Sequence, residues 1–168
     1  PWAESVVSDI EVEYKDEEEK LYYVRYFVDT KKHVITIATT RPETMFGDVA
    51  IAVHPLDKRY KKFIGKKVII PIVNRTIPIV GDEHVDMTFG TGALKITPAH
   101  DQNDKNIGDT YGLEVIDILN NDGTLNAHAL SFEGQDRFEA RPLISDELER
   151  LGLLEKVENH MNKVGTSE

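Results

Sequence analysis

The sequence has 168 residues, of which 40% are hydrophobic, and it carries a formal net charge of −10 and no cysteine. This length suffices for one globular domain with its own core and is too short for a large multidomain enzyme. The lack of cysteine excludes disulfides and thiolate chemistry, and the lack of about 20 consecutive apolar residues excludes a membrane-spanning helix. We therefore expect a soluble, cytoplasmic domain without a signal peptide, monomeric by default.

The predicted strands follow short apolar segments rich in aromatic and β-branched residues. Leu21–Val28 and Val34–Ala38 predict an antiparallel pair, and the acidic run Asp16–Glu19 before them predicts a turn or an exposed loop. Gly, Pro, Asn or Asp bound most of the remaining candidates, as is usual at strand ends. These further strands are predicted at Val49–Val53, Lys67–Ile70, Ile77–Val80, Ala93–Thr97 and Val115–Ile118.

Helical signals are fewer than strand signals. Helices are predicted at Asp57–Phe63, from Asp101 or Asn103 onward, and at Ser145–Leu151, where Gly152 supplies a stop. Pro142 is expected to break any longer helix that runs from Asp136, because proline lacks a backbone N–H. Residues 1–168 show no repeat and no linker-like tract, so they predict a single mixed α and β domain. The ending at Gly165–Glu168, without a helix stop or a closing strand, suggests a segment of a longer polypeptide.

The charge distribution bears on nucleic-acid binding. A net charge of −10 disfavours broad contact with a phosphate backbone, because Lys and Arg supply most of the sequence-independent affinity. Any nucleic-acid contact should therefore be local. The basic side chains that cluster in the sequence favour a solvated surface over a phosphate site, and they are Lys58, Arg59, Lys61, Lys62, Lys66 and Lys67.

The first polar segment that suggests a binding site is Thr39–Asp48, TTRPETMFGD, which follows a predicted strand. Thr39 and Thr40 supply hydroxyl groups, and Arg41 can bind a carbonyl, a phosphate or a carboxylate. Pro42 can start a short helix whose N–H groups face a polar ligand. By spacing alone, a structural strand end followed by a proline-started helix remains the more frequent interpretation of such a segment.

The second segment, Phe89–Asp104, combines a Gly-rich turn, a strand and a polar strand-to-helix connection. Lys95 and Thr97 should point to the same face of the strand. Asp101 and Asp104, three residues apart at a helix start, can also share a face. Such a group could hold an ammonium and a hydroxyl group and orient a water molecule. The ordinary structural alternatives are a helix cap at Asp101, a surface residue at Lys95 and a hydrogen-bonded loop histidine at His100.

Several chemistries lack support in the sequence. Gly90–Gly92 has neither the spacing of a dinucleotide fingerprint nor a P-loop continuation. The six histidines show no ligand pairing at helical spacing, which disfavours a metal site, and no Gly-x-Ser-x-Gly elbow is present. Hydrolysis by a positioned water molecule, helped by carboxylates, hydroxyls and a cation, remains.

Two long stretches carry a family resemblance. Thr39–Tyr60, TTRPETMFGDVAIAVHPLDKRY, and Gly90–Asp104, GTGALKITPAHDQND, resemble in the correct order the two signatures of the editing insertion in class I synthetases for valine, isoleucine and leucine. Glu43 resembles the valine form, because the leucine form typically has Asp there and the isoleucine form has Thr-Pro-Trp-Thr in this region. The flanks SDIEVEYKDEEEKLYYVRYFV and KVGTSE resemble the edges of that insertion. The synthetic signatures His-Ile-Gly-His and Lys-Met-Ser-Lys-Ser are missing.

The resemblance implies a compact α/β domain around a β-barrel-like core with peripheral helices, and an aminoacyl-tRNA deacylase activity. The implied reaction is hydrolysis of the ester of mischarged Thr-tRNA(Val). The implied partners are the 3′ CCA end of tRNA(Val) and the remainder of a synthetase, and editing itself requires no cofactor, since ATP and Mg²⁺ belong to the synthetic domain. An isoleucine-type domain that clears Val-tRNA(Ile), and a tRNA 3′-end binding module without activity, are the alternatives.

The resemblance also assigns site residues. Asp104 is expected to hold the α-ammonium group, and Asp101 and Lys95 to read the threonine hydroxyl or orient water, which makes these three the catalytic candidates. The remaining substrate-binding candidates, some of which would contact the terminal adenosine and the ester, are Thr39, Thr40, Arg41, Thr44, Phe89, Thr97 and His100.

Overall fold

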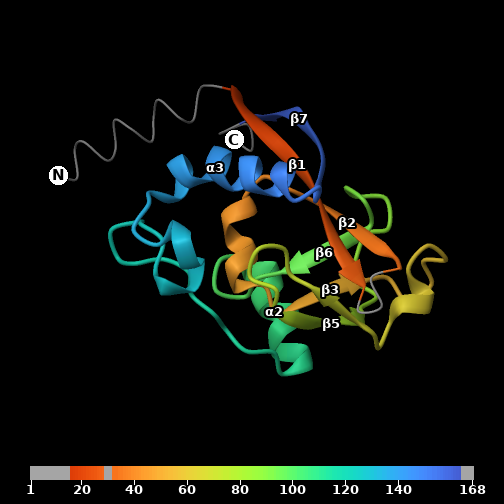
Figure 1. Ribbon diagram of the computed structural model, residues 1–168. Coiled ribbons are helices and arrows are strands. Elements are labelled where there is room, and N and C mark those ends of the chain that lie inside the picture. Colours follow the sequence, from red (N-terminus) through yellow and green to blue (C-terminus); the bar gives the residue numbers. More distant parts are fainter. Residues whose placement is uncertain (1–15, 29–31, 164–168) are drawn as a thin grey trace.

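The computed structural model describes residues 16–28 and 32–163, and the fold in this part of the chain is a twisted sheet with few helices (Figure 1). The strands are β1 (Asp16–Val28), β2 (Val34–Thr39), β3 (Ala50–Val53), β4 (Lys67–Ile69), β5 (Thr76–Gly81), β6 (Ala93–Ile96) and β7 (Leu154–Lys163). The α-helices are α2 (Gln102–Tyr111) and α3 (Arg137–Arg150), and the 3-10 helices are η1 (Pro42–Gly47), η2 (Lys61–Phe63) and η3 (Ala127–Phe132).

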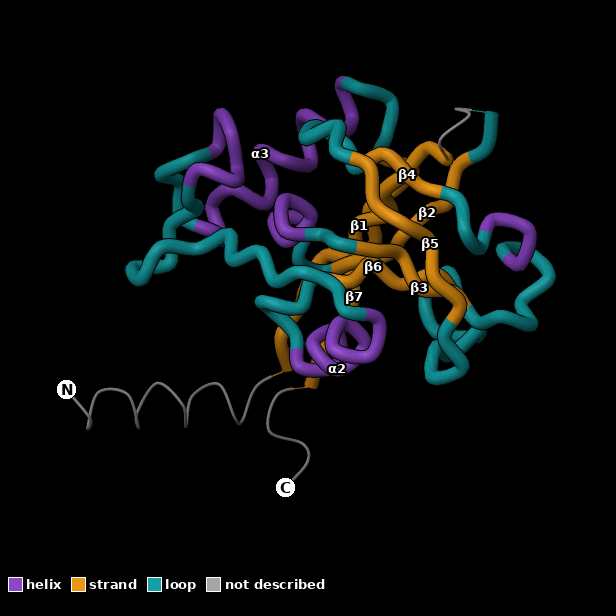
Figure 2. The backbone as a smooth tube through the Cα atoms, turned by 90° about the horizontal axis from the view of Figure 1, so that it is seen from below, coloured by secondary structure: helices purple, strands orange, loops and turns teal. Residues whose placement is uncertain are grey.

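The strands form one sheet in the order β2-β1-β4-β5-β3-β6, with β7 paired to β1 outside this path. All pairs are antiparallel except β3 with β5. The two ends of the path, β2 and β6, lie against each other. The hydroxyl of Thr91, two residues before β6, donates to the carbonyl of Thr36 in β2 at 2.6 Å. The sheet is therefore a nearly closed barrel, and α2 and α3 lie on different sides of it (Figure 2). This confirms the predicted mixed α and β fold with a barrel-like core.

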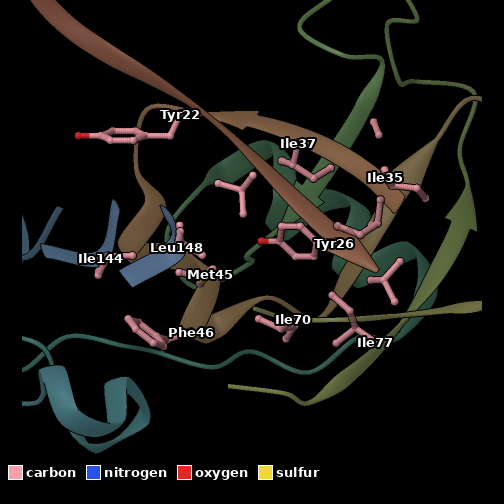
Figure 3. Packing of buried hydrophobic residues seen from close by; sticks show 14 of the residues in the cluster. Tyr22, Tyr26, Ile35, Ile37, Met45, Phe46, Ile70, Ile77, Ile144 and Leu148 are labelled. Carbon is pink, nitrogen blue, oxygen red and sulfur yellow. The ribbon is translucent and has the colours of Figure 1, made fainter. Parts of the chain in front are cut away.

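The core forms because β1 alternates strictly between buried and partly exposed side chains. Tyr22, Val24, Tyr26 and Val28 point inward from this strand, as the period of two in an extended chain requires. They belong to one core cluster with residues of β2, η1 and α3, and Figure 3 shows Tyr22 and Tyr26 among these side chains. The contacting side chains from those elements are Ile35, Ile37, Met45, Phe46, Ile144 and Leu148.

The predicted antiparallel pair is confirmed, since Tyr26 of β1 lies opposite Ile35 of β2. The strand predictions at β3, β4, β5 and β6 are also confirmed to within one or two residues. The predicted turn at Asp16–Glu19 is wrong, because these residues begin β1 and pair with the end of β7. A partner strand supplies their backbone hydrogen bonds, and this outweighs the low strand preference of acidic residues.

The predicted strand at Val115–Ile118 is also wrong. This segment is irregular, and side chains satisfy two of its backbone groups. The amide of Ile118 donates to Nε2 of His100 at 3.0 Å, and Nδ2 of Asn126 donates to the carbonyl of Asp117 at 2.7 Å. An apolar segment can therefore be buried, as Ile118 is, without joining the sheet.

Two helix predictions need correction. Helix α3 runs through Pro142, which was expected to break it. Asp136 caps the helix by accepting from the amides of Phe138 and Glu139, and the buried face around Ile144 outweighs the single hydrogen bond that proline removes. Of the predicted helix at Asp57–Phe63, only the last three residues are helical, as η2. The helix predicted to open near Asp101 is confirmed as α2.

Among the described residues, no helix has both the length and the apolar character needed to cross a bilayer. The quoted flanks of the family resemblance lie partly outside the described residues, at 8–15 and 164–168. The basic cluster around η2 is exposed at all six positions, as the prediction of a solvated surface requires.

Candidate functional site

A cavity of about 640 Å³ opens beside the place where β2 approaches β6, with α2 along one wall. Of the ten predicted site residues, all but Thr40 and His100 line it. Those that do are Thr39, Arg41, Thr44, Phe89, Lys95, Thr97, Asp101 and Asp104. The cavity thus joins the two sequence segments, which are about 50 residues apart in the chain.

Lys95 lies at the bottom of the cavity and is almost fully buried. Its ammonium donates to Oγ1 of Thr44 at 2.6 Å and to Oγ1 of Thr97 at 2.7 Å, and it forms an ion pair with Oδ1 of Asp48 at 2.7 Å. The close contact with Thr97, which directly follows β6, agrees with the prediction that the two side chains point to the same side of the chain. Three oxygen partners match the three N–H groups of an ammonium, so the protein itself satisfies this lysine.

Thr44, Lys95 and Thr97 form the floor of the cavity. Asp48 follows η1 and is completely buried beneath this floor. Besides the ion pair with Lys95, it accepts a hydrogen bond from the Tyr26 hydroxyl at 2.6 Å and from the Thr97 hydroxyl at 2.7 Å. Burial raises the pKa of Asp48, while the charge of Lys95 and these hydrogen bonds oppose the rise. The two guanidinium bonds from Arg75 to the carbonyls of Phe46 and Asp48 hold the backbone at this point.

The N-terminus of α2 supplies two carboxylates. Asp101 is the helix cap, since its Oδ2 accepts from the amide of Asp104 at 3.0 Å, and it also lines the cavity. Oδ2 of Asp104 accepts from the backbone amide of Thr97 at 2.9 Å. Burial, with the nearby charge of Asp101, raises the pKa of Asp104 to about 6, although the hydrogen bond from Thr97 opposes this. Asp104 is therefore a carboxyl group that titrates near neutral pH.

Arg41 and Phe89 stand nearer the rim. The Arg41 guanidinium donates to the carbonyl of His100 at 2.9 Å and lies 3.5 Å from Oδ1 of Asp101, while its side chain remains about one third exposed. The amide of Arg41 donates to Oγ1 of Thr39 at 3.0 Å. Phe89 is 74% exposed, which is unusual for a large apolar side chain and leaves its ring available to a planar ligand.

Two predicted residues do not reach the cavity. The ring of His100 points toward the irregular segment before η3, where Nε2 accepts from the amide of Ile118 and lies 3.3 Å from Asp117. Burial lowers the pKa of His100, and Asp117 opposes this. Thr40 is partly buried and does not line the cavity. The structural interpretation of His100 as a hydrogen-bonded loop histidine matches its contacts.

Sequence reasoning missed several residues of the site. Asp48 and Tyr26 form its foundation, and the strict alternation of β1 together with the end of the first motif could have indicated that both are buried. It also missed a second acidic wall, made by Asp82 and Asp86 with His84 between them. The described residues contain no group of three or more His, Asp or Glu side chains arranged to hold a metal ion.

Comparisons with known proteins place this site in context. A family model described as "Leucyl-tRNA synthetase, editing domain" matches residues 57–159. Valine–tRNA ligases from Christiangramia forsetii and Bacillus subtilis are 57% and 55% identical over all 168 residues, which are 19% of each ligase. The chain thus spans about a fifth of these relatives. Its fold is similar to a leucyl-tRNA synthetase from Agrobacterium radiobacter in a ternary complex with tRNA, with a TM-score of 0.65 and 20% identity over 95% of this chain and 22% of that one.

Proposed function

Since this chain belongs to the editing-domain family of the aminoacyl-tRNA synthetases, in the form that valyl-tRNA synthetases carry, we propose that it hydrolyses the ester bond of mischarged Thr-tRNA(Val). The observation that carries the proposal is the cavity, in which two carboxylates of α2 face two hydroxyls and a buried ammonium. This is a set of groups suited to an amino acid with a polar side chain.

The physical need for such a reaction is clear. A hydrophobic pocket shaped for valine cannot strongly reject threonine, an isostere with a hydroxyl in place of a methyl, and the discrimination established for valine-activating enzymes is only about 10². A second site that requires the hydroxyl can spare valine, because a methyl would leave its buried polar partners unpaired. The domain supplies that second selection.

We propose the following roles for residues that line the cavity. Asp104 holds the α-ammonium group of the substrate, and Asp101 orients the attacking water from the cap of α2. Lys95 contributes its buried positive charge. Arg41 contacts the ester or the phosphate next to it, and the exposed ring of Phe89 stacks on the terminal adenine.

The proposed partner is the single-stranded 3′ end of tRNA(Val). A solved relative of the same fold is a tRNA complex, and the cavity is large enough for an aminoacyl group with part of its ribose. The net charge of −10 fits a contact limited to this end. We propose that the remainder of a synthetase binds the body of the tRNA, and that editing needs no cofactor.

The test is the release of labelled amino acid from Thr-tRNA(Val), Val-tRNA(Val) and Val-tRNA(Ile) by the chain and by its Asp104→Ala variant. Release of threonine alone, lost in the variant, is the expected result. Release of valine from Val-tRNA(Ile) would instead indicate an isoleucine-type domain. Spontaneous decay only, with circular dichroism showing a folded chain, would exclude hydrolysis by this chain and leave at most a module that binds tRNA ends.

A further inference from the structure

We propose that Asp48, a carboxylate beneath the cavity, fixes the direction of the hydrogen bonds on the cavity floor, so that the floor can only accept a hydrogen bond from a substrate hydroxyl. Asp48 does not line the cavity, so it acts through Thr97 and Lys95 as a positioning residue that determines specificity. The inference deepens the proposed function and rests on it for the identity of the substrate.

The direction of each hydrogen bond follows from the charge of Asp48. Burial raises the pKa of Asp48, but the ammonium and the two hydroxyl donors that contact it all favour the ionised carboxylate, which can only accept. The Thr97 hydroxyl therefore donates its hydrogen bond to Oδ1 of Asp48, 2.7 Å away, rather than to the carbonyl of Thr44 at 3.5 Å. Lys95 donates to a lone pair of Thr97 Oγ1, so one lone pair remains.

The same reasoning applies to Thr44. Its hydroxyl donates to the carbonyl of Arg41 at 2.8 Å and accepts from Lys95 at 2.6 Å, which leaves one lone pair and no free proton. Both threonine hydroxyls at the bottom of the cavity thus offer only acceptors, and the carboxylates of Asp101 and Asp104 offer acceptors too. A substrate side chain with an O–H donor matches this floor, and a methyl group does not.

Asp48 is held in place from three directions. The Tyr26 hydroxyl from β1 binds Oδ2, so Oδ1 is left for Thr97 and Lys95. Arg75 binds the carbonyl of Asp48 itself. Because the carboxylate is fixed, neither oxygen can turn away. The hydroxyls of Thr44 and Thr97 therefore donate in one direction only.

The decisive variant is Asp48→Asn, which keeps the shape of the side chain but allows an amide N–H to donate to Thr97 and so turn the threonine proton toward the cavity. The matched control is Glu43→Gln, the same acid-to-amide change at a buried carboxylate of η1 that does not line the cavity and binds Arg141. The substrates are tRNA(Val) charged with threonine and with 2-aminobutyrate, which is threonine without its hydroxyl.

We expect the ratio of kcat/KM for the two substrates to fall at least tenfold in Asp48→Asn and to stay within twofold of the wild-type ratio in Glu43→Gln. An unchanged ratio in folded Asp48→Asn would overturn the inference. If that variant does not fold, Tyr26→Phe replaces it, because it frees Oδ2 of Asp48. It should then lower the ratio about threefold, and no change would again overturn the inference.

A binding measurement separates this inference from the proposed function. L-threonine amide and 2-aminobutyramide are titrated by NMR against the wild-type chain and Asp48→Asn. If the wild type hydrolyses neither ester but prefers L-threonine amide, and Asp48→Asn loses that preference, the proposed function fails and the role of Asp48 is supported. Equal binding of the two amides by the wild type would overturn the role of Asp48.

Discussion

Glu43 and Asp48 are two buried carboxylates five residues apart, within and just after the same 3-10 helix, yet they face different regions of the molecule. Glu43 binds the guanidinium of Arg141 in α3 through both oxygens, at 2.8 and 3.0 Å. Asp48 instead binds an ammonium, a phenol and a threonine hydroxyl under the cavity. Both oxygens of the first carboxylate bind the guanidinium of Arg141, and Nε of Arg137 lies 3.9 Å from one of them. The second carboxylate instead binds groups that line the cavity. Burial and charge alone therefore do not separate a structural acid from a functional one.

The largest expected effect comes from Lys95→Met, which removes the charge beneath the cavity. Asp48 then stays buried without its cation, and loss of one partner of a buried ion pair costs about 3–5 kcal/mol. Urea unfolding measures this loss of stability. Lys105→Met is the control, because its pair with Asp109 is exposed and should contribute less than about 0.5 kcal/mol. A loss below about 1 kcal/mol for Lys95→Met would show that the ion pair does not hold the floor together.

Glu43→Gln tests the buried carboxylate that binds Arg141 and does not line the cavity. Arg141 loses its charged partner, but its side chain is 17% exposed and can recruit water, so we expect a smaller loss of about 2 kcal/mol. Urea unfolding again gives the stability, and deacylation per folded molecule should not change. A selective loss of threonine release in a stable variant would move Glu43 into the site and remove the contrast with Asp48.

Asp104→Asn tests a carboxyl group whose burial disfavours its charge. The pKa of about 6 lies above the ordinary 3.8, so this group favours folding most below pH 4, and its contribution is lost as the pH rises through 6. The variant should therefore gain about 1–2 kcal/mol at pH 7, since a rise of the pKa from 3.8 to about 6 corresponds to at most about 3 kcal/mol. Its stability should also lose this pH dependence, which urea titrations between pH 4 and 8 measure.

The same pKa predicts a pH profile for the reaction. Threonine release should fall as the pH drops through about 6, because protonated Asp104 no longer holds an ammonium group. The rate of spontaneous ester decay at each pH is the control. A profile that is flat between pH 5 and 7.5 would contradict this role.

Phe89→Ala has the smallest expected effect on stability, below about 0.5 kcal/mol, because the side chain is 74% exposed. Its effect on activity should be larger, since stacking of a base on an aromatic ring contributes about 1–3 kcal/mol, and kcat/KM should fall at least tenfold. Phe138→Ala, at an exposed position in the first turn of α3, is the matched control. Equal activity of the two variants would remove Phe89 from the substrate contacts.

The sequence predicted those features that depend on neighbouring residues. The cap at Asp101 and the shared face of Lys95 and Thr97 follow from helix and strand periodicity, and both are present. The strand β7 escaped prediction because most of its described side chains are exposed and it has no apolar face to mark it. Its order comes from pairing with β1, which no local pattern reveals.

The foundation of the site depends on contacts distant in the chain. Tyr26 meets Asp48 across 22 residues, and Asp48 meets Thr97 across 49. Such contacts arise from the order of strands in the barrel, and this order is a property of the whole sheet. The motif Thr39–Asp48 indicated where a site would lie, but it could not indicate which of its two acids faces that site.

The nearly closed barrel also affects the edge strands of the sheet. An edge strand presents unpaired N–H and C=O groups that can recruit a second chain and begin aggregation. Here the two edges of the sheet path, β2 and β6, face each other, and Ala38 and Leu94 on them line the cavity. The mouth of the cavity thus lies where these two edge strands shield one another. A substitution that widens this mouth is therefore expected to favour self-association as well as to alter selectivity.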